Sequence, residues 1–389
     1  MAGNMHRRTS VVPQRVGAAS TDGGRMYEQT ARNRDLRLVP SPPPRAEQDS
    51  RVAVLLNANA RRVSQKVVRS LLHVVPEEDL FLSRSALDAR RIAQLVLDRR
   101  YHTVFCGGGD GTFMAFVNHV LAELELRNQH HYQRPPRFGV LRLGTGNALA
   151  NFVNASTHRR DGVLDDVLRA RAGEVPGYRR VELFRVDGKR TMFAGVGIDG
   201  QIINDYNAVK ETLGRGLLSG LMTGGGGYFA SVAFRTLPHY ITHSAKRECE
   251  LINGHGVAYR LGPDGNPIQE FQPGELIFRG PVRLAAAGTT PFFGFGMRAF
   301  PFAGHRRGMM HLRLVASSNT EILAHLAGFW AGRYFTPSMG EYLVSEAVLR
   351  FDGAMPLEVA GDACGYQSEL HLEMCPEQVE LVDYTGSVH

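Results

Sequence analysis

Lysine is nearly absent from this chain of 389 residues, although its formal net charge is +7. The lysines are Lys66, Lys189, Lys210 and Lys246, and arginine supplies the rest of the positive charge. Arginine suits phosphate and anionic headgroups. Because the excess charge is spread along the chain and is not interleaved with aromatic residues in one stripe, no nucleic-acid surface is predicted.

Cysteine and metal-ligand patterns are also scarce. The 4 cysteines show neither paired nor zinc-type spacing, which excludes a disulfide framework and favours reduced thiols in a cytoplasmic protein. No histidine stands in a metal-ligand pattern. No apolar core follows the arginines near the N-terminus, so a secretory signal peptide is not expected.

The composition and the apolar periodicity of the sequence predict a tail and two domains. Residues 1–49 are rich in Arg, Ser, Gly and Pro and lack apolar periodicity, which predicts a disordered tail. Residues 50–175 alternate apolar strands with helices, the pattern of a parallel sheet with helices on both faces. Residues 176–389 change to period-two strands and turns, which predicts an antiparallel β-sandwich. A helical insertion is expected at 201–237.

Two glycine loops follow successive strands of the α/β region. Residues 107–112 (GGGDGT) come after one apolar strand, and residues 144–147 (GTGN) come after the next. A third loop begins at Asn57. Parallel strands end at a common edge where α/β sheets bind ligands, and helix N-termini favour phosphates, so the three loops predict a nucleotide cradle. The plain alternative for any one loop is a strand–helix connection without a ligand.

These loops resemble the diacylglycerol kinase catalytic domain, which diacylglycerol, sphingosine and ceramide kinases share. The GGDGT loop of that family is matched by residues 108–112, and its GTGN loop by residues 144–147. GGDGT also occurs in NAD kinases and phosphofructokinases, whereas a GTGN loop in the next βα unit is more specific to lipid kinases. The family's opening Asn-Pro-x-(Ala/Ser)-Gly segment is matched in part, by Asn57 and Ala60. The resemblance covers residues 50–385.

The resemblance implies that ATP and Mg²⁺ are used, with ATP in the cleft between the domains. The nucleotide-binding candidates are Asn57, Gly108, Gly109, Asp110, Gly111, Thr112, Gly144, Thr145, Gly146 and Asn147. Asp110 is the main candidate for contact with the nucleotide or with Mg²⁺-bound water, because a carboxylate in a phosphate loop calls for a nearby cation. For Asn147, helix N-capping is an alternative role that is compatible with binding. Direct metal ligands are left open.

The acceptor side of the predicted site rests on Asp362. Related kinases carry Asp-Gly-Glu late in the β domain, whereas this chain has Ala360, Gly361 and Asp362, so one carboxylate remains. We expect Asp362 to act as the base or as a metal-linked acid, with a plain turn aspartate as the alternative. Asp199 is expected to support the metal or to orient Asp362, with capping of the next helix as its alternative.

These features predict an ATP-dependent lipid kinase that phosphorylates a hydroxyl of a diacylglycerol or a sphingoid-type lipid at a membrane surface. The protein is expected to be cytoplasmic, with peripheral membrane contact, and a homodimer is an option because related kinases are often dimers. The uncharged run within 201–237 is interpreted as a lid or lipid-entry element rather than a membrane span. Two alternatives stay open: NAD kinase-like phosphorylation of a soluble metabolite, and an inactive nucleotide- or lipid-binding module.

Overall fold

The computed structural model describes six stretches of the chain: 51–60, 62–127, 134–157, 162–197, 246–294 and 296–385. The expected tail at 1–49, the expected insertion at 201–237 and the candidate residue Asp199 lie outside the described residues. In the described part, no helix has the length and apolar character that crossing a bilayer requires.

The first half of the chain forms the predicted parallel sheet. Its strands lie in the order β4-β3-β1-β2, and every neighbouring pair is parallel. They are β1 (Val52–Asn57), β2 (Leu80–Ser83), β3 (Thr103–Gly108) and β4 (Arg137–Arg142). β3 is buried along its whole length, as expected for a strand covered on both faces.

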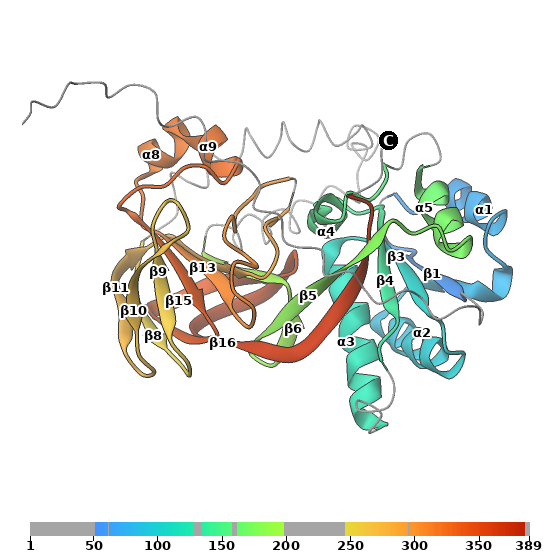
Figure 1. Ribbon diagram of the computed structural model, residues 1–389, viewed down its shortest axis with the longest axis horizontal. Helices are drawn as coiled ribbons and strands as arrows, with labels where there is room; N and C mark the ends of the chain where they lie inside the picture. The colour runs from blue at the N-terminus through green and yellow to red at the C-terminus, as the bar shows by residue number, and fades with distance from the viewer. Residues whose placement is uncertain are drawn as a thin grey trace, which may run out of the picture. The chain divides into compact units, whose positions relative to one another are not determined.

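Helices cover both faces of this sheet (Figure 1). α2 and α3 pack on one face with α4 beside them, and α1 and α5 pack on the other, so the sheet separates two apolar cores. The helices are α1 (Gln65–Leu72), the short 3₁₀ helix η1 (Glu77–Asp79), α2 (Ala86–Asp98), α3 (Asp110–Leu126), α4 (Ala148–Phe152) and α5 (Gly162–Arg171). A capping box at Ser85 and Asp88 fixes the start of α2.

The second half is built from antiparallel strands around a core of their own. Their order is β10-β9-β14-β13-β12-β7-β15-β16, with β8 and β11 added beside β15. The elements are β5 (Gly177–Val186), β6 (Lys189–Thr191), β7 (Phe193–Gly197), β8 (Arg247–Asn253), β9 (Ala258–Leu261), β10 (Pro267–Phe271), β11 (Leu276–Val282), β12 (Leu284–Gly288), β13 (Met310–Val315), α8 (Asn319–Ala324), α9 (Leu326–Trp330), β14 (Met339–Val344), β15 (Glu346–Val359) and β16 (Asp362–Asp383).

One long strand connects the two halves. β16 pairs antiparallel with β15 and β5, and near its end Leu381 pairs parallel with Phe138 of β4 (Figure 1). The sequence pattern predicts a strand only at residues 370–374, because the charged residues on either side hide the continuation. The start of this strand is Asp362, so the strand that joins the parallel sheet also carries the predicted acceptor carboxylate.

Candidate active site

The three predicted loops meet at the carboxyl edge of the parallel sheet. Asn57, at the end of β1, donates from Nδ2 to the Thr112 hydroxyl of the second loop at 2.9 Å. Arg62, which follows β1, donates from Nη1 to the Gly144 carbonyl of the third loop at 2.8 Å. Side chains of the first loop therefore link to both of the others. The sequence analysis gave Arg62 no role, although a guanidinium at a phosphate loop is a strong candidate for phosphate binding.

Close backbone approach explains a glycine in the GTGN loop. A Cβ added to Gly144 would lie 2.5 Å from the Gly108 carbonyl oxygen, so the two loops touch through their backbones. Gly109, the N-cap residue of α3, has the opposite environment, because a Cβ there would meet no atom within 4 Å. The tight contact fixes the loops, and the open position leaves room for an anion at the start of a helix of 17 residues.

Asp110 holds the second loop against the third. Its Oδ2 accepts from the Ala148 amide at 3.0 Å and its Oδ1 from the Leu149 amide at 3.1 Å, so the carboxylate caps α4. Burial raises the pKa of Asp110, and the negative charge of Asp362 raises it further. The structure thus gives Asp110 a positional role that the sequence did not indicate, because its partners lie 38 and 39 residues away.

Asn147 occupies the N-cap position of α4 without capping it. Its backbone is left-handed, with φ 51°, and its side chain makes no capping bond. Instead its Nδ2 donates to the Gly144 carbonyl at 3.0 Å, which closes the turn of the loop. The capping alternative for this side chain is therefore wrong, since Asp110 does the capping. Thr145 and Gly146 are half-exposed between these two residues.

The structure brings Asp362 to the glycine loop. A Cβ added to Gly111 would overlap the Asp362 carboxylate, so the acid lies directly against the backbone of the GGDGT segment. The two residues are 251 positions apart in the numbering (362 − 111), and the sequence alone gave no distance between them. The predicted acceptor acid and the predicted phosphate loop thus belong to one site.

A strained turn presents this acid. Asp362 follows Ala360 and Gly361, whose φ values are 53° and 88°, in a two-residue hairpin turn between β15 and β16. Glu358, which is fully buried, accepts the Gly361 amide and stabilises the turn. The side chain of Ala360 is buried in the core rather than in the site. Glu358 was missed because a buried glutamate inside a strand has no distinctive sequence signal.

The site contains two acids, Asp110 and Asp362, whose carboxyl groups influence each other electrostatically. Burial raises the pKa of Asp362, and the positive charge of Lys189 opposes that rise. Burial also raises the pKa of the neighbouring Cys364 thiol. Carboxyls with raised pKa values beside a phosphate loop can exchange protons or hold a cation near neutral pH. Lys189 is a second residue that the sequence analysis did not assign to the site.

Apolar groups lie on the β side of the same loops. A Cβ added to Gly146 would lie 3.8 Å from the Cα of Gly294, and the half-buried Phe292 and Phe293 precede that glycine. A small apolar cavity lies in the antiparallel core, and Leu357 in its wall is on the strand that ends at the Asp362 turn. Phe292 and Phe293 therefore place apolar side chains near the phosphate loops.

The described residues fit a nucleotide and a magnesium ion. The backbone at Gly109, which has open space beside it, the Thr112 hydroxyl and the Arg62 guanidinium offer donors of the kind that bind phosphates. In the described part of the chain, no three His, Cys, Asp or Glu side chains are grouped to hold a metal by themselves. Mg²⁺ usually needs only one or two carboxylates in addition to phosphate oxygens, and Asp110 in the loop itself would be one.

Comparison with known proteins relates the parallel-sheet part of the chain to one family. Residues 51–176 match the family model of the diacylglycerol kinase catalytic domain. The described loops at Asn57, residues 108–112 and residues 144–147 all fall within the matched segment. A search of curated proteins finds no significant match for the chain.

Solved structures extend the fold similarity beyond the matched segment. A crystal structure of a diacylglycerol kinase from Bacillus anthracis strain Sterne aligns with a TM-score of 0.55 and 11% identity, covering 87% of this chain and 98% of that one. Two candidate diacylglycerol kinases from the same strain align with a TM-score of 0.57, at 14% and 15% identity, each covering 87% of this chain and 99% of the other. At identities this low, the alignments show a shared fold and nothing more. Their coverage includes both the parallel-sheet part and the antiparallel part of this chain.

Proposed function

We propose that this protein is an ATP-dependent lipid kinase that transfers the γ-phosphate to a hydroxyl of a diacylglycerol or a sphingoid-type lipid at a membrane surface. The observation that carries the proposal is the position of Asp362 against Gly111. A phosphate loop alone binds nucleotides, whereas a phosphate loop in contact with an acid from another part of the fold can also activate an acceptor.

The proposed reaction is an in-line phosphoryl transfer. The acceptor oxygen attacks the γ-phosphorus, the bond from that phosphorus to the β–γ bridging oxygen breaks, and ADP leaves. The hydroxyl proton passes to the Asp362 carboxylate. Backbone amides of the glycine loops, the Thr112 hydroxyl and the Arg62 guanidinium bind and orient the phosphates. Asp110 would hold Mg²⁺ together with phosphate oxygens, and the ion would supply neutralisation of the phosphate charge.

Apolar side chains near the phosphate loops support a lipid acceptor. Phe292 and Phe293 lie beside the GTGN loop. A soluble dinucleotide acceptor would need polar and charged partners for its ribose and phosphate groups.

A lipid-panel assay tests the proposal. The full chain is incubated with Mg²⁺, γ-³²P-ATP and mixed micelles that each contain one hydroxyl lipid, and the organic phase is counted. Label in a diacylglycerol or a sphingoid base is the expected result. Label only in a soluble metabolite, measured without micelles, would contradict the lipid acceptor. Binding of Mg-ATP with no labelled product from either arm would instead support the inactive module.

A further inference from the structure

Two hairpins of the same kind end at the site. The β5–β6 hairpin turns at Asp187 and Gly188, with φ values of 47° and 83°, and the β15–β16 hairpin turns at Ala360 and Gly361. The first residue after the first turn is Lys189, and the first residue after the second turn is Asp362. Two-residue turns of this kind fix the register of both strands, so each tip holds its charged residue in a defined place.

The Lys189 ammonium faces the strand that carries Asp362. Its Nζ lies 3.9 Å from Sγ of Cys364. Cys364 is two residues beyond Asp362 in β16, and residues two apart in a strand lie on the same face. The electrostatic effect of Lys189 on the Asp362 carboxyl agrees with this placement. The lysine and the acid therefore share one side of the hairpin tips.

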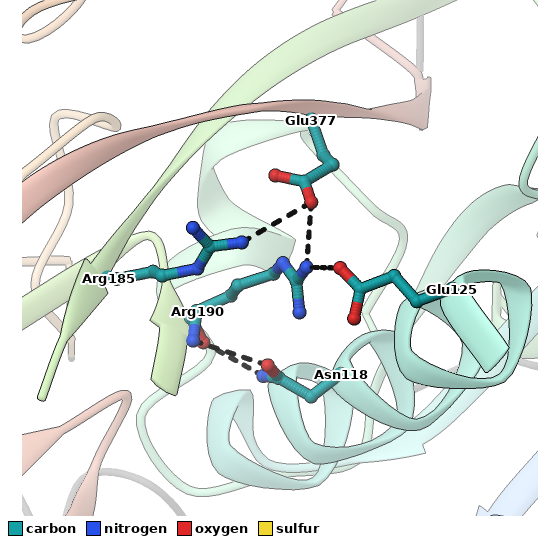
Figure 2. A network of polar contacts seen from close by, with 5 residues as sticks. All are labelled: Asn118, Glu125, Arg185, Arg190 and Glu377. Atoms are coloured by element: carbon teal, nitrogen blue, oxygen red, sulfur yellow. Dashed lines mark hydrogen bonds and ion pairs between the residues drawn. The ribbon is translucent and has the colours of Figure 1, made fainter. Parts of the chain in front are cut away.

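The next residue anchors this tip to the helix that begins in the phosphate loop (Figure 2). Asn118 of α3 accepts from the Arg190 amide at 3.2 Å and donates to the Arg190 carbonyl at 2.8 Å. The Arg190 guanidinium pairs with Glu125 of α3 and, at 2.7 Å, with Glu377 of β16. Lys189 is thus attached to a rigid point on α3, although its own side chain is exposed.

The charge of Lys189 is not neutralised by an ion pair. Within the described stretches, no carboxylate lies within ion-pair distance of its ammonium, whereas the neighbouring Arg190 is paired with two. An exposed lysine usually contributes only solubility. A lysine held at the tip of a fixed hairpin, on the same side as the acceptor acid, has the placement of a phosphate-binding group.

We propose that Lys189 is a catalytic residue of the phosphoryl transfer, donating from Nζ to a non-bridging oxygen of the migrating phosphoryl group beside Asp362. The inference rests on the proposed kinase function and deepens it. No bond to the lysine forms or breaks, and its proton stays on Nζ. The interaction strengthens as negative charge accumulates around the phosphorus, so it acts mainly on kcat.

The kinetic test compares Lys189→Met with Lys189→Arg. Loss of one donor to a developing oxyanion costs about 100-fold in kcat, so we expect a fall of about that size for Lys189→Met with little change in KM for ATP. Lys189→Arg keeps the charge and should recover most of the loss. Lys246→Met, which removes another exposed lysine just before β8, should match the wild type. A kcat within about twofold of the wild type for Lys189→Met would overturn the proposal.

A change in the lipid phase distinguishes the two phosphate groups that Lys189 could bind, the migrating phosphoryl group and the headgroup of an anionic lipid. The same variants are assayed in neutral detergent micelles and in vesicles containing an anionic phospholipid. A defect of equal size in both is expected if Nζ binds the migrating phosphoryl group. A defect confined to anionic vesicles would assign the lysine to lipid headgroups, and the proposal would be wrong.

A measurement that does not require catalysis tests the placement of Lys189 separately from the proposed kinase function. With ¹³C-labelled aspartate, the Asp362 carboxyl signal is identified by its loss in Asp362→Asn and is then titrated. The midpoint should move to higher pH in Lys189→Met than in the wild type, because the ammonium favours the ionised carboxyl. An unchanged midpoint contradicts the placement of Lys189 whether or not any lipid is phosphorylated. A shifted midpoint in a protein that labels no lipid would reject the kinase function alone.

Discussion

The same three elements build two charged regions with opposite character. α3, β16 and β6 contribute Glu125, Glu377 and Arg190 to the network in Figure 2. The same elements contribute Asp110, Asp362 and Lys189 to the candidate site. In the network the cation is 7% exposed and paired with both acids. In the site both acids have raised pKa values and the lysine has no described carboxylate partner.

The difference separates charges that stabilise the fold from charges kept for chemistry. In the network, each ionised group is compensated by a partner in the folded chain, which is the arrangement expected for a structural connection. In the site, burial opposes ionisation of Asp362, so folding leaves this carboxylate in an unfavourable environment. Unfavourable electrostatics that the fold itself does not relieve are typical of functional sites.

The largest expected effect is that of Asp362→Asn. Removing a general base costs about 10²–10⁴-fold, so lipid labelling should fall by about a thousandfold. The melting temperature should not fall with it. The folded-state pKa of Asp362 is raised, so the ionised carboxylate lowers stability at pH values above that pKa, and the amide removes this penalty at neutral pH.

The matched control for this variant is Asp352→Asn, which changes an exposed aspartate of β15. It should leave both turnover and melting temperature unchanged. A lower melting temperature for Asp362→Asn, measured by calorimetry at pH 7, would mean that the acid is a structural turn residue. The contrast between the two regions would then not hold.

The second effect is expected in the network. Arg190→Met leaves Glu377, whose side chain is 16% exposed, with only the longer contact to Arg185 at 3.5 Å. Breaking a buried ion pair costs 3–5 kcal/mol, so the free energy of unfolding in urea should fall by about 3 kcal/mol because the pair here is partly exposed. Arg190→Lys keeps the positive charge and should recover part of the lost free energy of unfolding.

A surface pair provides the comparison for Arg190. Arg350 and Glu369 are paired at 2.8 Å, with side chains 55% and 59% exposed. Arg350→Met should therefore lower the free energy of unfolding by less than about 1 kcal/mol. If Arg190→Met and Arg350→Met lower the free energy of unfolding by the same amount, the network in Figure 2 is an ordinary surface feature and does not anchor β6 to α3.

The sequence predicted the parallel half of the fold and the loops of the site well, because both depend on local signals. Apolar runs followed by glycine and a helical pattern identify β3 and β4 and the loops after them, and an apolar run followed by Asn57 and a helical pattern identifies β1. The Asp187-Gly188 pair identifies the β5–β6 hairpin. These features are determined by residues a few positions apart.

The contacts that join distant segments could not be predicted. β10, β11 and β14 were missed, and β16 was expected to be far shorter, because exposed or charged residues interrupt the alternation on which strand prediction depends. The capping of α4 by Asp110 and the placement of Lys189 depend on pairing between segments far apart in sequence. A single sequence carries no record of such pairing.

The smallest effect tests whether contact between the two halves matters for turnover. In Gly111→Ala the new methyl group would occupy the place of the Asp362 carboxylate, and the acid must move. A displacement of about 1 Å in a reacting group can cost about 100-fold, and a partial adjustment of this side chain should lower kcat by about tenfold. Stability should change little, because the displaced carboxylate is already in an unfavourable environment.

A double-mutant cycle makes this prediction specific. If Gly111→Ala acts by displacing the acid, the change should have no further effect on the residual turnover in an Asp362→Ala background, where the carboxylate is missing. Gly109→Ala is the contrasting variant, because a Cβ there meets nothing in the folded chain. It should leave the Asp362 titration unchanged and weaken only the binding of Mg-ATP, measured by calorimetry. Additive effects of Gly111→Ala and Asp362→Ala on kcat would show that the loop and the acid act independently.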